Sequence, residues 1–314
     1  MDAAVKKGGK MRKKEKQEKK EVKMTRKRNK KTAVILMTGV MMTLAFFAMS
    51  LTASAKEFKY DFPDSAADVN VNLDGRSVLD GEAAIIDSVT YVPLRSFSEL
   101  CGAESISWDA RTRTATVKKY NMTAKISQDK DYIEASGRYF YLSNDIKNIN
   151  DRLFIPVRIA SQLFSVDVDW NAQSRTVVLK STNRSFVSGD SFYNKNDLYW
   201  LSRIISAESS GEPLRGKIAV GNVVLNRKES KSYPNTVYGV IFDRKNGTQF
   251  SPVATGAIYN TPTAESIIAA KICLEGYSIS DSILFFMNPR IATNHWIANN
   301  RPFAFRIGNH YFYN

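Results

Sequence analysis

Hydrophobic positions at helical spacing open the last third of the chain. Four residues follow one another at steps of three, four and three: Leu198, Leu201, Ile205 and Glu208. Residues at this spacing share one face of a helix, so Glu208 stands at the end of an otherwise apolar stripe. Asn196 is a good N-cap for this helix. The pattern therefore predicts a buried helix that ends in a carboxyl group.

Two further helices are predicted after this one. The helical pattern breaks at residues 209–211, and Glu212-Pro213 then begins a second helix that runs to about Arg227, with proline at a tolerated early position. A third helix is predicted over residues 261–276, with Gly276 as its stop. Cys273 is expected in the last turn of that helix.

The middle of the chain is an internal repeat, residues 90–119 against 153–181. Three blocks match in register: Val92-Pro93-Leu94-Arg95 with Ile155-Pro156-Val157-Arg158, Trp108-Asp109-Ala110 with Trp170-Asn171-Ala172, and Arg113-Thr114 with Arg175-Thr176. Each copy predicts a short amphipathic helix, an alternating strand, a polar turn and a second strand. Trp108 and Trp170 hold the same strand position, and we expect both in the core because large aromatic residues are usually mostly buried; the alternative is that they are platforms on which sugar rings stack.

These patterns predict an α+β chain built from a β-rich duplicated accessory module and a C-terminal α+β domain. Residues 73–76 and 135–138 are predicted to form hairpin turns between strands of the module. The module covers residues 68–181, and residues 182–194 are rich in Ser, Asn and Gly without periodicity. We therefore interpret them as a linker. The C-terminal domain then covers residues 195–314.

The N-terminus has the order of an export signal. Residues 1–31 contain 15 Lys and Arg against 4 Asp and Glu, and an uncharged segment follows over residues 32–55. We expect residues 1–31 to be disordered because like charges repel, and residues 53–55 (Ala-Ser-Ala) predict cleavage and a mature chain beginning at Lys56. The alternative is an uncleaved membrane anchor, since about 20 apolar residues span a bilayer. Both readings place the remaining chain outside the cytoplasm, with the membrane contacted only through an uncleaved segment.

Charge and residue counts exclude several classes of function. The net charge is +14, of which residues 1–31 carry +11, so a nucleic-acid binder is not expected because its basic surface should lie on the folded domain. The chain has two cysteines in different predicted domains, and its two histidines are His295 and His310. Neither a disulfide framework nor a zinc site of the usual spacing can be built from these residues. We therefore predict no metal and no cofactor.

Glu208 is the strongest catalytic candidate. Apolar neighbours disfavour the charged form of a carboxyl group, so its pKa should rise, which suits a glycosidase acid that must hold a proton near neutral pH. The alternative is an ion pair with Arg203 or Arg215. Glu212 most simply complements the dipole at the start of the second helix.

The C-terminal residues resemble a known family. The run LSRIISAESSGEPLRGKIAVGNVVLNR (residues 201–227), the run Gln249-Phe250-Ser251 and the terminal IGNHYFY (residues 307–313) are similar to the SleB-type cell-wall hydrolase family, which includes spore-cortex-lytic enzymes. The resemblance implies a lysozyme-like α+β hydrolase domain with Glu208 as the catalytic acid and Glu212 in a supporting role. It also implies substrate-binding or supporting positions at five residues: Gln249, Phe250, Ser251, Asn288 and His310. The residues before Asn288 depart from the family pattern.

A single well-placed carboxyl group favours a lytic transglycosylase, which the family resembles. Conventional glycosidases use two carboxylates, whereas four other acidic residues have the pattern of surface or helix-end charges: Asp243, Glu265, Glu275 and Asp281. The implied substrate is peptidoglycan of the spore cortex or vegetative wall. Glu208 would cleave the bond between N-acetylmuramic acid and N-acetylglucosamine, acting first as acid and then as base.

The module is similar to the copper amine oxidase N-terminal-like domain of exported bacterial proteins. Because no histidine precedes His295, the module offers no imidazole to copper, and we expect it to attach to peptidoglycan or another wall polymer. Two alternatives for the whole chain stay open. One is a wall-binding protein without catalysis, and the other is a wall peptidase that uses Cys273. A cysteine in the last turn of a helix is poorly placed for the second, since the helix dipole opposes a thiolate there.

Overall fold

A computed structural model describes residues 57–245 and 247–314, which belong to one unit of the chain. The predictions for residues 1–31 and 32–55, including the cleavage site, lie outside the described residues. Within the described part of the chain, no helix combines the length and apolar character needed to cross a membrane. The same residues contain no group of three or more potential metal ligands.

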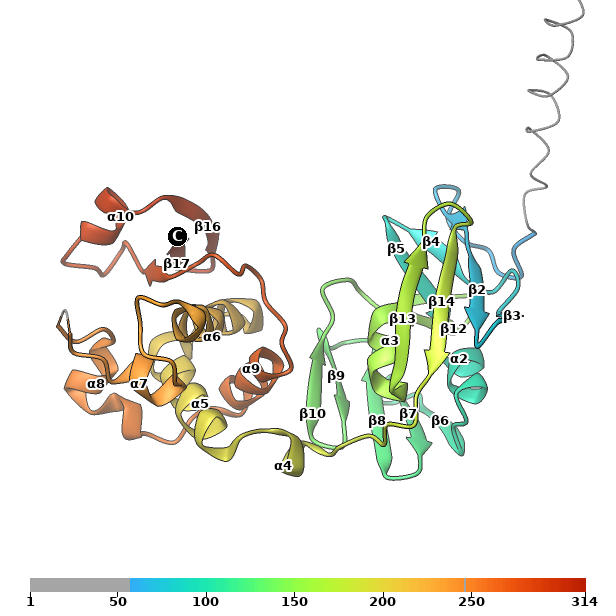
Figure 1. The fold of residues 1–314 in the computed structure, drawn as a ribbon, viewed down its shortest axis with the longest axis horizontal. Coiled ribbons are helices and arrows are strands. Elements are labelled where there is room, and N and C mark those ends of the chain that lie inside the picture. Colours follow the sequence, from blue (N-terminus) through green and yellow to red (C-terminus); the bar gives the residue numbers. More distant parts are fainter. Residues whose placement is uncertain (1–56, 246) are drawn as a thin grey trace, which may run out of the picture. The chain divides into compact units, whose positions relative to one another are not determined.

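The N-terminal part of the unit consists of three sheets and two helices (Figure 1). The first sheet has the order β1 (Ala67–Asp68), β4 (Ala84–Ile86), β5 (Val89–Pro93), β12 (Arg152–Pro156) and β11 (Lys147–Ile149). The second has the order β10 (Arg138–Tyr141), β9 (Tyr132–Ala135), β8 (Met122–Ser127), β7 (Thr114–Lys119) and β6 (Ser105–Asp109). The third has the order β13 (Val166–Asn171), β14 (Thr176–Ser181), β2 (Asn70–Leu73) and β3 (Arg76–Val78).

The predicted repeat is confirmed in three dimensions. Helix α2 (Leu94–Leu100) follows β5, and helix α3 (Val157–Phe164) follows β12 at the equivalent place. The two strands lie beside each other as an antiparallel pair in which Val92 faces Ile155. The two copies therefore meet along β5 and β12, and both helices pack into one hydrophobic core.

Both predicted hairpin turns are present. Asp74 and Gly75 join β2 to β3 with φ of 51° and 84°, and Ser136 and Gly137 join β9 to β10 with φ of 43° and 83°. Two consecutive residues with positive φ are typical of the two-residue turns whose twist matches that of the flanking strands. Glycine at the second position is favoured because it has no Cβ to strain.

The prediction that both repeat tryptophans are core residues is wrong. The relative exposure of Trp108 is 48% and that of Trp170 is 40%. Both residues lie on edge strands, β6 and β13, which have a neighbour on one side only. The outer ends of these strands extend past the core that covers Ile106 and Val166, so their aromatic rings stay accessible.

The segment between the two predicted domains is packed against the module. Phe186 belongs to the module's hydrophobic core, and its carbonyl accepts a hydrogen bond from Asn121 Nδ2 at 2.8 Å. The short helix α4 (Gly189–Phe192) begins where the Gly189 N–H donates to the Ser136 carbonyl at 2.9 Å. A Cβ on Gly189 would lie 2.3 Å from the Gly137 carbonyl oxygen, so only glycine permits this contact.

The C-terminal part is a group of helices with a small sheet (Figure 1). Its helices are α5 (Lys195–Ser209), α6 (Leu214–Glu229), α7 (Val237–Ile241), α8 (Ser251–Thr255), the 3-10 helix η1 (Ala257–Tyr259), α9 (Ala264–Leu274) and α10 (Trp296–Asn300). Its sheet has the order β15 (Phe285–Met287), β17 (His310–Tyr313) and β16 (Phe303–Ile307). The predicted α+β class, with a β-rich region followed by a more helical one, is confirmed.

The three helices predicted from periodicity are present, with small differences at their ends. Asn194 rather than Asn196 caps α5, and its side chain accepts hydrogen bonds from the N–H groups of residues 196 and 197. Helix α6 begins after Pro213, and α9 is capped by the Thr263 side chain. Helix α5 packs against both α6 and α9, which places its apolar stripe in the core of this part.

A buried ion pair joins the module to helix α9. The Arg138 guanidinium donates to both carboxylate oxygens of Glu275, at 2.8 and 2.6 Å, and the Tyr193 hydroxyl donates to Glu275 at 2.6 Å. Glu275 is the C-cap of α9 but its side chain is only 7% exposed, so the prediction of a surface charge is wrong. Lys271 adds a hydrogen bond to the Gly137 carbonyl at 2.9 Å.

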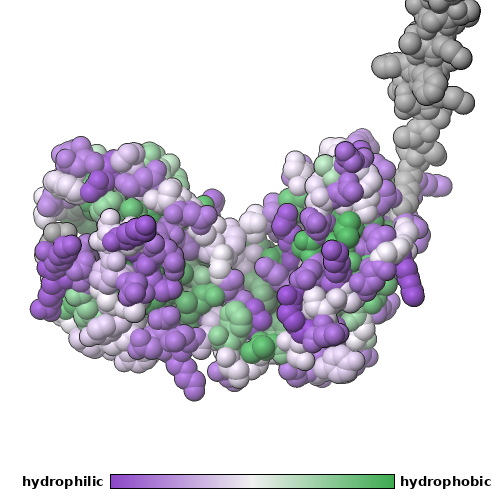
Figure 2. Space-filling model, in the orientation of Figure 1, coloured by the Kyte–Doolittle hydropathy of each residue, from purple (hydrophilic) through white to green (hydrophobic). Residues whose placement is uncertain are grey.

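On the face drawn in Figure 2, hydrophobic residues left at the surface form small groups among hydrophilic ones.

Candidate active site

Glu208 lies in the last turn of α5, where the sequence pattern places it. Leu201, Ile204 and Ile205 on the same helix are fully buried in the core of this part. The Glu208 side chain is half-buried at the edge of that core. Helix α5 ends at Ser209, whose hydroxyl donates to the Ile205 carbonyl at 2.6 Å. Helix α5 thus places Glu208 at its C-terminal end, next to the exposed turn that follows the helix.

The carboxyl group of Glu208 forms no hydrogen bond and no ion pair with any other described residue. Burial among apolar neighbours raises its pKa from 4.5 to about 7, and this loss of hydration is the cause of the shift. A carboxyl group in this condition is protonated in a large fraction of molecules at neutral pH. It can therefore donate a proton and, once ionised, accept one.

The alternative of an ion pair for Glu208 is not found. The Arg203 guanidinium lies over the Tyr199 ring, 3.6 Å from the ring centroid, and Arg203 Nη1 donates to the Tyr199 carbonyl at 3.4 Å. No salt bridge joins Glu208 to Arg203 or Arg215 in the described part of the chain. The one strongly perturbed carboxyl group of this part is thus left free for chemistry.

Glu212 fixes the terminal hairpin. Its carboxylate accepts from the Asn309 backbone N–H at 2.9 Å and from Asn309 Nδ2 at 3.1 Å. Gly308 has a φ of +57°, and a Cβ there would lie 1.8 Å from Glu212 Oε2, so the turn between β16 and β17 needs glycine to approach this carboxylate. Glu212 is buried. Glu212 therefore binds the hairpin, a contact that the helix-dipole role predicted from its position before α6 did not include.

Lys217 holds the start of α6 from inside the core. Its side chain is 2% exposed, and its ammonium donates to the Glu212 carbonyl and to Glu265 Oε2, the latter at 2.6 Å. A buried lysine requires such partners because an unpaired charge in the interior is costly. Glu265 in the first turn of α9 is otherwise exposed, as predicted. Lys217 therefore connects α6, α9 and the segment that follows Glu208.

Gln249, Phe250 and Ser251 lie at the start of α8. Gln249 Oε1 accepts from Arg227 Nη1 at 3.5 Å, and the Phe250 ring is buried below the Arg227 guanidinium at 5.2 Å. Arg227 also donates to the Leu284 carbonyl at 2.7 Å, and its burial lowers its pKa. Ser251, the first residue of α8, is exposed. One buried arginine thus joins this predicted run to the strand that precedes Asn288.

His310 is the first residue of β17 in the small sheet, and Asn288 directly follows β15. The His310 ring contacts the Phe286 ring edge to face, with centroids 5.2 Å apart, and burial lowers the His310 pKa, opposed by the charge of Glu212. His310 Nδ1 is buried and has no hydrogen-bond partner in the described residues. Asn288 follows β15 and accepts from the Arg290 N–H at 3.1 Å.

Several predicted site residues are therefore linked through contacts that the sequence did not indicate. Phe286 touches Phe250 on one side and His310 on the other, while Asn309 joins His310 to Glu212. Helix α5, which carries Glu208, contacts α8 and η1. Arg227, Lys217 and Phe286 were missed because their motif positions look like ordinary core or helix-end residues. For Lys217 and Arg227, the sequence signal is a charged residue within a largely apolar helical pattern.

Cys273 is a core residue. It is 2% exposed, its thiol donates to the Ile218 carbonyl at 3.4 Å, and burial raises its pKa well above the ordinary value. A Cβ on Gly221 would lie 2.6 Å from its sulfur, which shows how closely α6 and α9 pack here. A thiol in this environment stays protonated and is shielded from substrate. The cysteine-peptidase alternative is therefore not favoured.

Comparison with known proteins places the two parts of the chain in families. Residues 211–313 match the family model for Cell Wall Hydrolase, and residues 72–179 match that for the Copper amine oxidase N-terminal domain. The chain is 40% identical over 120 residues to a spore cortex-lytic enzyme of Bacillus cereus, covering 38% of this chain and 45% of the relative. It is 38% identical over 120 residues to that of Bacillus subtilis, covering 38% of each. The chain thus spans less than half the length of these curated relatives.

A solved structure covers the C-terminal part. The catalytic domain of the germination-specific lytic transglycosylase SleB from Bacillus anthracis is 39% identical, with 40% of this chain and 98% of that chain covered and a TM-score of 0.36. The family models thus identify a cell wall hydrolase domain over residues 211–313 and, ahead of it, a copper amine oxidase N-terminal domain over residues 72–179. Both resemblances stated from the sequence are confirmed.

Proposed function

We propose that this protein cleaves the glycan strands of peptidoglycan as a lytic transglycosylase, with Glu208 as its acid and base. The observation that carries the proposal is the half-buried Glu208 carboxyl group, which has a raised pKa and no hydrogen-bond partner among the described residues, just ahead of residues 211–313 that match the Cell Wall Hydrolase model. Relatives named spore cortex-lytic enzymes, and a solved relative titled a lytic transglycosylase, support both the substrate and the reaction.

The reaction needs one carboxyl group used twice. Protonated Glu208 gives its proton to the glycosidic oxygen between N-acetylmuramic acid and N-acetylglucosamine as the C1–O bond breaks. The carboxylate so formed then takes the proton of the muramic acid C6 hydroxyl, whose oxygen bonds to C1 and closes a 1,6-anhydro ring. The proton returns to Glu208, no water is consumed, and neither metal nor cofactor enters this scheme.

The neighbouring residues are assigned supporting roles in this proposal. Glu212 positions the terminal hairpin through Asn309, and Gln249 is held by Arg227 at the start of α8. We assign Gln249, Phe250, Ser251, Asn288 and His310 to substrate binding or to the support of substrate-binding surfaces. The protein acts outside the cytoplasm after export through residues 1–55, on cortex or vegetative wall peptidoglycan.

The pH dependence of cleavage tests the acid role of Glu208. Because the folded pKa of Glu208 is raised to about 7, the protonated acid is abundant below neutral pH and is lost as the pH rises through that value. We expect kcat/KM for cleavage of purified peptidoglycan to fall about tenfold per pH unit above an apparent pKa near 7. Rates measured from pH 5 to 9 would contradict the assignment if the falling limb were absent or centred near the ordinary value of a glutamate.

A further inference from the structure

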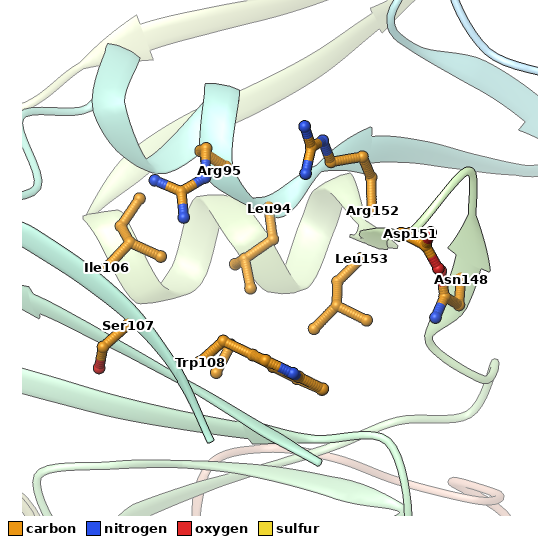
Figure 3. A pocket seen from close by; sticks show the side chains of 10 residues that line it. Leu94, Arg95, Ile106, Ser107, Trp108, Asn148, Asp151, Arg152 and Leu153 are labelled. Atoms are coloured by element: carbon orange, nitrogen blue, oxygen red, sulfur yellow. The ribbon is translucent and has the colours of Figure 1, made fainter. Parts of the chain in front are cut away.

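A pocket of about 280 Å³ opens in the accessory module, away from Glu208. It lies between the first turn of α2, the end of β6 and the turn that joins β11 to β12 (Figure 3). The volume is at the low end for small-molecule sites, so the pocket suits a single sugar ring of a longer chain better than a large cofactor. No function is assigned to this pocket by the reaction proposed above.

The floor of the pocket is aromatic. The Trp108 ring lies along the pocket, and the side chains of Leu94 and Leu153 point toward it from α2 and β12 (Figure 3). The relative exposure of Trp108 is 48%. A half-exposed indole leaves apolar surface in contact with water, which is unfavourable. A ligand with an apolar face would cover this surface on binding. The C–H face of a pyranose ring is such a surface.

The rim of the pocket is polar and carries two guanidinium groups. The Arg152 guanidinium forms no hydrogen bond or ion pair with any other described residue. Arg95 has one exposed contact, with Glu99 at 3.4 Å. Asp151 and Asn148 complete the rim, and Asp151 is its only acid. One unpaired guanidinium group and one with a single exposed contact, against one carboxylate on the rim, favour a ligand that brings an anionic group, and guanidinium groups match carboxylates in geometry.

We infer that this pocket binds the glycan strand of peptidoglycan, with a hexosamine ring on Trp108 and a stem-peptide carboxylate on Arg95 and Arg152. The inference rests on the proposed function, because the polymer bound by the module would be the polymer cleaved by the same chain. The apolar floor would contact the apolar face of the sugar ring, and the polar rim would form hydrogen bonds with its hydroxyl groups. The two arginines would bind the stem-peptide carboxylate. Two sites on one polymer raise the local concentration of glycan at Glu208.

The repeat supplies a matched comparison. Trp170 is the equivalent of Trp108 in the second copy and is 40% exposed, but it does not line this pocket. The strand position equivalent to Arg152 is Val89, since β5 and β12 both end in the repeated proline. The second copy therefore keeps one arginine, Arg158 in place of Arg95, and lacks a counterpart of Arg152. Trp170→Ala removes an indole of comparable exposure from the same fold without altering the proposed site.

Binding to insoluble peptidoglycan tests the inference. The whole protein carrying Glu208→Gln, which leaves the polymer uncut, is sedimented with purified sacculi from which anionic wall polymers have been stripped. We expect Trp108→Ala to weaken the apparent affinity by about tenfold or more, as for loss of an aromatic anchor, and Arg152→Gln to weaken it as well. Trp170→Ala should leave binding and thermal unfolding unchanged. Equal binding of the Trp108 and Trp170 variants, or binding only to sacculi that retain phosphate polymers, would overturn the inference.

Cleavage assays separate this inference from the proposed function. With Glu208 intact, we expect Trp108→Ala to cleave soluble glycan fragments at the rate of the unaltered protein and intact sacculi more slowly. Loss of activity on both substrates would place Trp108 outside a tethering role and overturn the inference. If the unaltered protein cleaves no glycan while the binding differences persist, the proposed reaction fails and the binding site stands.

Discussion

Replacement of Glu208 by glutamine is expected to lower the rate of glycan cleavage by about a hundredfold or more, because an amide cannot give up and recover a proton at useful rates. Glutamine has nearly the same shape, so the core around α5 should be unaffected. The loss is measured as the release of soluble fragments from purified peptidoglycan. A variant with unchanged circular dichroism and undiminished turnover would contradict the assignment.

The stability of the same variant gives an independent readout. The charged form of Glu208 is disfavoured by burial, since its folded pKa of about 7 lies above the ordinary value. The penalty is absent at low pH and grows as the pH rises from the unfolded pKa to the folded pKa. Glu208→Gln should therefore unfold at a higher temperature than the unaltered protein at pH 8 and at a similar one at pH 4.5. The matched control is Glu229→Gln, where the side chain is 77% exposed and neither activity nor stability should change.

Glu275→Ala is expected to destabilise the protein by about 3 kcal/mol, since removal of one partner of a buried ion pair leaves the other charge without compensation. Arg138, 15% exposed on its side chain, would lose both of its carboxylate contacts, and the Tyr193 hydroxyl would lose its acceptor. The Arg138 guanidinium would keep only ring contacts, among them Phe192 at 3.7 Å. The free energy of unfolding is measured by urea denaturation.

An exposed ion pair in the module provides the control for this prediction. Arg113 and Asp129 are 2.9 Å apart and their side chains are 55% and 57% exposed. Asp129→Ala should cost less than about 1 kcal/mol, because water solvates both charges and screens their attraction. Equal losses in the two variants would mean that the Arg138–Glu275 pair does not hold the module against α9.

Local patterns in the sequence predicted most of the fold. The repeat, both glycine hairpins and helices α5, α6 and α9 follow from periodicity and turn chemistry, which act over a few residues. The burial of Trp108 was mispredicted because it depends on whether its strand has one neighbour or two. The burial of Glu275 was missed because its partner Arg138 lies 137 residues away in the chain. Both errors concern contacts that only the assembled sheets and helices decide.

The candidate site also contains residues whose roles follow from local sequence patterns and residues whose roles depend on distant segments. Glu208 is recognisable from an apolar stripe that ends in an acid, and its lack of partners within residues 57–245 and 247–314 agrees with that pattern. The buried roles of Lys217 and Arg227 depend on carbonyl and carboxylate groups brought from other segments, so no local pattern specifies them. Glu212 is intermediate, since its place before α6 is visible in the sequence whereas its contacts with Asn309 are not.

The most direct test of the account is the chemistry of the new glycan ends. The protein is incubated with purified peptidoglycan in water enriched in ¹⁸O, and the masses of the released fragments are measured by mass spectrometry. We predict 1,6-anhydro-muramic acid ends without ¹⁸O, because the C6 hydroxyl attacks C1 and no water is consumed. Reducing ends that carry ¹⁸O would contradict transglycosylation, and release of free peptides with intact glycan would contradict glycan cleavage by Glu208 altogether.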